Sequence, residues 1–288
     1  MNIPRISYFS KKEKEENEKD TIKKTIGSAA LLGITGTGIT GINGMKFAEK
    51  EKSAGRKFEE ALKKEGEKAV TVIKDSKFNN SASFPASVGK LVRFTKKHNP
   101  EGYKSGLAKG LGVSESTIET LEKSKKPVVV IGKHSSDAAL AHELGHSHYQ
   151  SGKGFLGRVA HNLSPISNLA GTKLGAYGGG MVSGISSVKE NSKGEAEIDK
   201  KKLLQHAGIA AALQIPLLVA EGAASRKGLQ MLKKSGADKK ALKEAKSMLG
   251  NAYNTYIGAA AFRTGRFVGG QGIGAAIEVN RKKKKNKK

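Results

Sequence analysis

Cysteine and tryptophan are both absent from the 288-residue chain. Without cysteine there can be no disulfide scaffold, thiolate zinc site, iron–sulfur cluster or cysteine nucleophile. Any metal bound by these residues must therefore be held by His, Asp or Glu. Aromatic residues make up 5% of the chain, and 26 acidic residues face 52 basic ones, which gives a net charge of +26. This excess suits nucleic acid, anionic lipid or an acidic partner, and it does not choose among them.

Glycine is abundant, with 36 residues. Small residues add little to a soluble core, but they let helices approach closely inside a bilayer. The uncharged run 25–45 is long enough to span a membrane and places Ala29, Gly33, Thr37 and Gly41 four residues apart. The run therefore predicts a membrane helix, with a flexible linker as the alternative.

Three further stretches carry few charges: 163–188, 203–220 and 252–277. Only 203–220 is both uncharged and apolar enough for a good membrane helix, because a Lys or Arg at a helix centre costs about 2.5–3.5 kcal/mol on insertion scales. The segment 281–288 holds seven basic residues. We expect it to be attracted to anionic lipid headgroups, and to nucleic acid only nonspecifically.

The chemistry of the chain lies in SSDAALAHELGHSHYQ, residues 135–150. Ser135 or Ser136 can cap a helix there, on which His142 and His146 share one face with Glu143 beside them. This HExxH motif lets two imidazoles bind one zinc ion, which lowers the pKa of a bound water to about 7. Glu143 would take the proton. The alternative is a surface helix with two solvated histidines.

The β-branched run PVVVI at 127–131 predicts a strand immediately before this helix. A strand followed by an active-site helix is the zincin arrangement. A strand at the edge of a sheet can hold an extended peptide by main-chain pairing. We therefore expect 127–131 to be the edge strand of a substrate cleft.

Spacing does not fix a third ligand. The metzincin pattern requires glycine and histidine where the chain has Tyr149 and Gly152, and no acid occurs between Glu143 and Glu190. Glu221 is the strongest distant candidate, because it ends an uncharged run and opens an amphipathic helix. The other candidates are Glu190, Glu195, Glu197, Asp199, Asp238, Glu244, Glu278, His148 and His161.

Two blocks of sequence carry a family resemblance. AHELGHSHYQSGKG, residues 141–154, is similar to an HExGH segment. PLLVAEGAASRKGLQMLKKSGADKKALKEAKSMLGNAYNTY, residues 216–256, is similar to a Pro-x-x-x-x-Glu-x-x-Ala-Ser-Arg helix, a Gly turn and an Ala-rich helix ending in Thr-Tyr. Both blocks, about a fifth of the chain, resemble the YugP-like neutral zinc metallopeptidases, relatives of the HtpX-like membrane peptidases.

The resemblance implies a membrane-associated zinc metallopeptidase that hydrolyses peptide bonds in a peptide or protein substrate. Its implied site residues are His142, His146 and Glu221 as Zn²⁺ ligands and Glu143 as catalytic base. Where many relatives have an aspartate that orients a ligating histidine, this chain has Ser225. Arg226 or Tyr256 could steady the oxyanion.

The expected fold is mainly α with a small β element, in which a zincin-like catalytic domain is combined with Gly-rich membrane helices. The expected parts are a charged leader (1–24), a membrane helix (25–45), the first part of the catalytic domain with the HExxH helix (46–158), a membrane hairpin (159–220) with a polar connector (189–202), the third-ligand helix and the next helix (221–251), a Gly/Ala-rich membrane or packing helix (252–280) and a basic tail (281–288). The rival interpretation is a non-enzymatic membrane-inserting structural, virion or toxin component with a vestigial zinc site.

Overall fold

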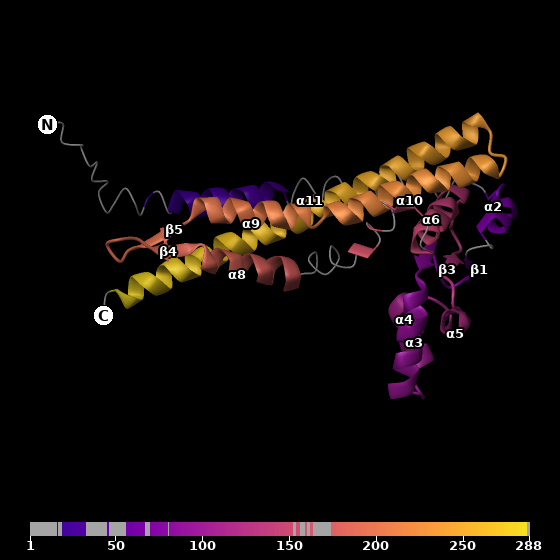
Figure 1. Cartoon of the computed structure of the whole chain (residues 1–288), viewed down its shortest axis with the longest axis horizontal. Helices are drawn as coiled ribbons and strands as arrows, with labels where there is room; N and C mark the ends of the chain where they lie inside the picture. Colours follow the sequence, from indigo (N-terminus) through magenta and orange to yellow (C-terminus); the bar gives the residue numbers. More distant parts are fainter. Residues whose placement is uncertain are drawn as a thin grey trace. The chain divides into compact units, whose positions relative to one another are not determined.

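A computed structural model describes residues 16, 19–32, 45, 56–66, 70–79, 81–151, 154–155, 159, 162–163 and 174–286. The described part is mainly helical with a few short strands, as expected (Figure 1). The chain divides into two compact units. The motif unit consists of Ile39–Pro165 and Ile215–Ile257, and the glycine-rich unit consists of Met1–Gly38, Ile166–Gln214 and Gly258–Lys288.

The motif unit contains a three-stranded sheet in the order β1-β3-β2. Its strands are β1 (Thr71–Lys74), β2 (Ala82–Phe84) and β3 (Val128–Ile131). β3 confirms the strand predicted at 127–131, but the prediction that it lies at the edge is wrong. It is the central strand, parallel to β1 and antiparallel to β2. The four residues VVVI of β3 are buried on both faces, as continuous β-branched runs of central strands are.

Each face of β3 supports a separate core. Val128 and Val130 pack with helices on one side, and Val129 and Ile131 pack with helices on the other, because successive side chains point to opposite faces. The first side is covered by α3 (Ala86–His98), α4 (Tyr103–Leu111) and α5 (Glu115–Lys123). The second side is covered by α2 (Glu59–Gly66), α6 (Asp137–Gln150) and parts of α10 (Ile215–Lys234) and α11 (Lys239–Lys285).

Helix α11 runs without interruption from Lys239 to Lys285. The predicted segments 221–251 and 252–280 are thus joined within one helix, and the division between the two compact units falls between Ile257 and Gly258. The turn between α10 and α11 lies inside 221–251, where Gly236 has a φ of 90° that favours glycine. The basic segment 281–288 also begins inside this helix rather than after it. Lys282 to Lys285 lie in the last turn, where positive charge interacts favourably with the helix dipole.

The glycine-rich unit contains helical residues 19–32, η1 (Leu174–Gly178), α8 (Gly179–Ser186), α9 (Lys200–Ala212) and the C-terminal part of α11. The predicted polar connector 189–202 has regular secondary structure. It forms a β-hairpin of β4 (Val188–Glu190) and β5 (Ala196–Ile198) and then enters α9. The hairpin turns at Asn191, whose Oδ1 accepts from the backbone N–H of Lys193 and Glu195, and at Gly194, with a φ of 73°.

Two glycine pairs let α8 pack directly against α11. A Cβ on Gly180 or Gly184 of α8 would come closer than 3.0 Å to the backbone of α11. In the opposite direction, a Cβ on Gly270 would come as close to the backbone of Tyr177 in η1, and one on Gly274 to that of Met181 in α8. Both pairs are spaced by four residues, the arrangement by which helices approach closely in membranes. The sequence predicted such packing for a different segment, 25–45, from its small residues spaced four apart. Residues 33–44 of that segment lie outside the described residues.

Among the described residues, one helical region is long and apolar enough to cross a membrane. It is Lys200–Lys234, which contains the predicted run 203–220. Its most apolar window of 18 residues has a mean hydropathy of 1.6, and 28% of that window is buried. A core helix of a soluble protein can share this length and composition. Most of 159–173, the first part of the predicted hairpin, lies outside the described residues.

Candidate metal centre

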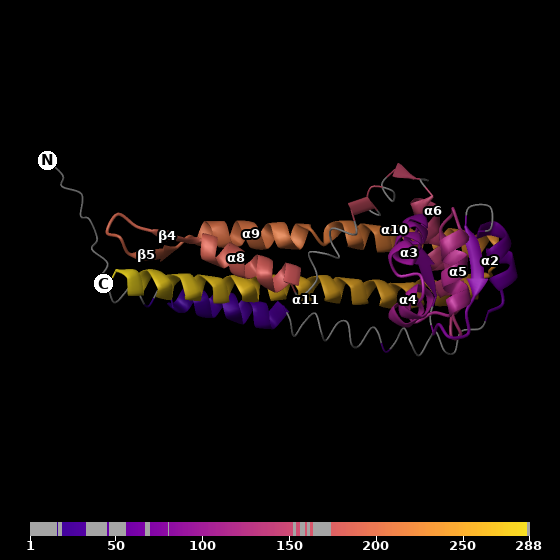
Figure 2. The ribbon, with the colours of Figure 1, turned by 90° about the horizontal axis from the view of Figure 1, so that it is seen from below.

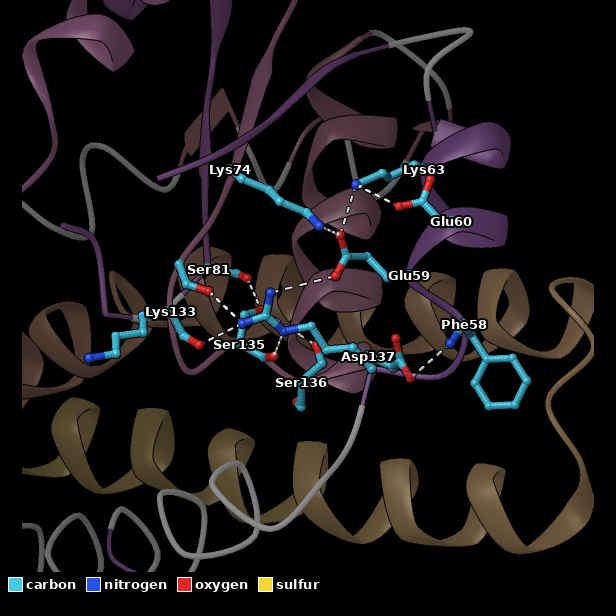
Figure 3. A network of polar contacts seen from close by, with 12 residues as sticks. Phe58, Glu59, Glu60, Lys63, Lys74, Ser81, Lys133, Ser135, Ser136 and Asp137 are labelled. Atoms are coloured by element: carbon cyan, nitrogen blue, oxygen red, sulfur yellow. Dashed lines mark hydrogen bonds and ion pairs between the residues drawn. The ribbon is translucent and has the colours of Figure 1, made fainter. Parts of the chain in front are cut away.

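The N-terminus of α6 is held by a polar network (Figure 3). Ser136 caps the helix by accepting from the backbone N–H of Ala139 at 3.2 Å, which settles the choice between the two predicted caps. Arg56 donates to the backbone oxygens of Gly132, Lys133 and Ser135 at 2.6–2.9 Å. These hydrogen bonds fix the loop between β3 and α6.

Asp137, in the first turn of α6, extends this network. Its Oδ2 accepts from the backbone N–H groups of Lys57 and Phe58 at 2.6 and 3.1 Å (Figure 3). Burial raises the pKa of Asp137. The position of α6 along its axis is therefore set by backbone partners on both the β3 side and the α2 side.

Two glycines bring α6 and α10 into direct contact. A Cβ on Gly145 would come closer than 3.0 Å to the backbone of Ala224, and a Cβ on Gly228 would collide in the same way with the backbone of Ala141. Residue numbers rise along one helix as they fall along the other, so the two helices are antiparallel. Without side chains at the crossing, residues on the facing surfaces come within reach of one ion.

Three such residues converge at this crossing. His142 Nε2 and His146 Nε2 lie 3.0 Å apart, and each lies 3.2 Å from Glu221 Oε2. The structure thus brings together the three residues that the family resemblance implied as ligands. His142 and Glu221 are buried, at 6% and 7% exposure, and the side chain of His146 is 13% exposed, so the three atoms are largely shielded from water.

The donor set fits a zinc ion. Zinc takes imidazole nitrogen and carboxylate oxygen at about 2.0–2.2 Å, which in a tetrahedral site separates neighbouring ligand atoms by about 3.3 Å. The separations of 3.0–3.2 Å are close to this value. A cation would also remove the repulsion among the lone pairs of these atoms. That the group binds a metal remains a prediction.

Glu143 lies beside the three residues. Burial raises its pKa above the ordinary value, and the nearby imidazoles of His146 and His142 oppose this effect only in part. Burial lowers the pKa of His146, but the hydrogen bond and the negative charge of Glu221 raise it more, so the net shift is upward. A backbone hydrogen bond from Ser83 of β2 also reaches the Glu143 carboxylate. The site therefore joins α6, α10 and the edge strand.

Of the other predicted site residues, the structure brings two to the group and leaves one apart. Ser225 Oγ lies 3.1 Å from His142 Nδ1, so it is placed to orient this imidazole with Nε2 facing the group. Tyr256 makes a side-chain hydrogen bond with Glu221 and lies near Glu143. Arg226 is exposed on α10, and no contact joins it to the other site residues within the described part of the chain. The expectation that Arg226 could steady an oxyanion is therefore not supported.

Several rival ligands have other partners. Glu190 pairs with Lys282, Asp199 caps α9, Asp238 accepts from the N–H of Ala241, and Glu278 pairs with Arg281. Glu195 is hydrogen-bonded to Asn191, and the ring of His148 contacts Tyr149. His161 lies outside the described residues.

The feature that sequence reasoning missed is β2. This strand forms an edge of the sheet and lies next to α6. Ser83 Oγ lies 2.8 Å from Ser147 Oγ and donates to Gln150 Oε1 at 3.0 Å, which ties the strand to the motif helix. The segment ASF is too short to give a clear strand signal, and the proline that follows it was the available clue.

Replacing Gly145 by Ala is expected to force α6 and α10 apart, because the new methyl group meets the backbone of Ala224 rather than a flexible side chain. Overpacking of this kind costs about 1–3 kcal/mol. The loss is measured as a fall in denaturation midpoint. Gly110→Ala is the matched control, since a Cβ at this helical position meets nothing within 4 Å. Equal stability of the two variants would show that the helices do not meet as described.

Comparisons with known proteins identify no relative. The chain matches no family model, no curated protein and no solved structure. The function must therefore be argued from the residues and their geometry.

Proposed function

We propose that this chain is a membrane-associated zinc metalloendopeptidase of the YugP-like type. One observation carries the proposal: two imidazole nitrogens from an HExxH helix and one carboxylate oxygen from a second helix, 75 residues away, lie 3.0–3.2 Å from one another. Burial of a carboxylate and two imidazoles is costly unless they are paired or bind a metal. Gly145 and Gly228 let α6 and α10 approach closely enough for these atoms to meet, which supports the same proposal.

The roles of the residues follow from their places. His142, His146 and Glu221 would hold the zinc, which when bound supplies a Lewis acid and lowers the pKa of water at its open position. Glu143 would accept the proton of the attacking water and deliver it to the leaving amine. Ser225 would keep the His142 imidazole oriented, and the Tyr256 hydroxyl could donate to the developing oxyanion.

A zincin-like catalytic domain is the interpretation of the motif unit that best fits this chemistry. The supporting feature is β2, an antiparallel edge strand whose Ser83 reaches both Glu143 and α6. Its outer edge can pair with the backbone of an extended peptide. A peptide or protein substrate bound in this way would lie beside the base and the proposed zinc.

Association with a membrane is supported by the region Lys200–Lys234, by the glycine packing of α8 against α11, and by the net charge of +26. Anionic lipid is the partner that this charge favours, because clustered Lys and Arg next to apolar helices are attracted to acidic headgroups. Co-sedimentation with vesicles of anionic and of zwitterionic lipid tests this part separately from catalysis.

The proposed activity is tested with the full chain purified in a nonionic detergent and incubated with casein. We expect peptide release that stops when 1,10-phenanthroline removes the metal and returns when Zn²⁺ is restored. Release that is insensitive to the chelator, or no release at any zinc concentration, would contradict the proposal.

A second candidate, a non-enzymatic membrane-inserting component, is favoured by one observation, the stripe of glycines between α8 and α11. It predicts leakage of dye from anionic vesicles without any proteolysis. A chain that permeabilises vesicles but releases no peptide in the presence of zinc would favour this candidate over the peptidase.

A further inference from the structure

The glycine-rich unit contains a cavity of about 330 Å³ between α8, α9 and α11. These helices lie side by side in both views (Figures 1 and 2). The volume falls within the range of about 300–1,000 Å³ that is typical of small-molecule sites. The cavity belongs entirely to this unit, and none of the candidate metal-centre residues lines it.

The walls of the cavity are largely apolar. Ile209 and Leu213 of the α9 side, Val182 of α8 and Phe267 of α11 all line it. Val182 is 67% exposed and Ile209 is 52% exposed, so the apolar lining continues onto the outer surface of the unit. A linear alkyl chain could therefore enter from the outside and lie along these side chains.

A positively charged side chain lines the same cavity. Arg263 of α11 lines it, half-buried, and one of its guanidinium nitrogens donates to Gln214 Oε1 at 3.4 Å. Within the described residues this is the guanidinium's one hydrogen bond, although arginine has five N–H donors. A partly buried guanidinium in an apolar pocket is expected to have an anionic partner.

The chain supplies no such anion among the described residues. The ion pairs of the glycine-rich unit join Lys24 to Asp20, Lys189 to Asp199, Arg281 to Glu278 and Lys282 to Glu190, and none includes Arg263. The sequence between Glu143 and Glu190 also contains no acid at all. Within the part of the chain that the structure describes, the guanidinium of Arg263 therefore has no anionic partner, and it can pair with the acid group of a bound ligand.

We propose that this cavity binds one amphipathic acid, an alkyl chain ending in a carboxylate or phosphate, with the chain against Val182, Ile209 and Phe267 and the acid on Arg263. Arginine pairs with both groups through two parallel N–H bonds. A free fatty acid and the phosphate of a lipid share this chemistry. The inference does not depend on the proposed peptidase activity, because it concerns different residues in a different unit.

The test is titration of the full chain in a nonionic detergent with four ligands, followed by native mass spectrometry to count molecules bound per chain. Dodecanoate and dodecyl phosphate carry both the chain and the charge, 1-dodecanol carries the chain alone, and inorganic phosphate carries the charge alone. We expect one dodecanoate or dodecyl phosphate per chain. 1-Dodecanol is expected to bind about tenfold more weakly, because it forms no charge-assisted hydrogen bond, and inorganic phosphate is not expected to bind measurably.

Arg263→Gln is expected to lower the affinity for the acids to that for 1-dodecanol, and Arg263→Lys to restore part of the loss. Arg266→Gln is the matched control: Arg266 is one turn along α11, lies over the ring of Phe262 at 4.1 Å and does not line the cavity. It should leave every affinity unchanged.

Preference for dodecanoate would point to a fatty acid, and preference for dodecyl phosphate to a phospholipid; either result supports the proposal. Equal binding of 1-dodecanol and the acids, equal losses in Arg263→Gln and Arg266→Gln, or no binding would overturn it. Circular dichroism of each variant confirms that the helices remain intact.

Discussion

The Glu143→Gln variant is expected to bind as much zinc as the parent chain and to cleave casein about 10²–10⁴-fold more slowly, the usual contribution of a general base. Gln has nearly the size of Glu but cannot accept the proton of the attacking water. Glu143 is not a member of the candidate ligand group, so its loss should leave metal binding unchanged. Zinc content and the initial rate of peptide release are measured on the same preparation.

The matched control for this substitution is Glu60→Gln on α2, which is exposed and pairs with Lys63. It should cleave at the rate of the parent. If Glu143→Gln also cleaves at the parental rate, Glu143 is not the base. If Glu143→Gln instead loses its zinc, Glu143 holds the metal directly and the assignment of ligands must change.

The Glu221→Ala variant is expected to lose more than about 100-fold in zinc affinity. Removing even an outer partner of a ligand typically costs 10–100-fold, and Glu221 would be a ligand itself. The two histidines that remain lie on one turn of α6 and offer only imidazole nitrogen. Affinity is measured by competition with a chromogenic zinc chelator.

Glu197→Ala is the control for this loss, because Glu197 is exposed on β5 in the other unit. It should bind zinc as the parent does. The opposite result, retained zinc in Glu221→Ala and lost zinc in Glu197→Ala, would move the third ligand to the β-hairpin and contradict the geometry of the motif unit.

Local patterns in the sequence predicted several elements well. The strand at 127–131 and the helix of the HExxH motif with its serine cap depend on neighbouring residues, and the structure has them. In each case a β-branched run or a cap within a few residues determines the outcome.

Features set by tertiary contacts were not predicted. No local pattern distinguishes a central strand from an edge strand in 127–131, since this depends on where β1 and β2 pair. The collision that would follow from a side chain at Gly145 depends on Ala224, 79 positions later. The exposure of Arg226 depends on which face of α10 meets α6. Sequence alone could name the residues of the site through a family resemblance, but it could not show that they meet.

The central claim is that His142, His146 and Glu221 hold one zinc ion, and X-ray absorption spectroscopy at the zinc edge of the purified parent chain tests it most directly. The account predicts one zinc per chain, surrounded by nitrogen and oxygen at about 2.0–2.2 Å. It predicts that this signal is absent from a chain carrying both His142→Ala and His146→Ala. A parent chain that binds no zinc, or a doubly substituted chain with an unchanged spectrum, would contradict it.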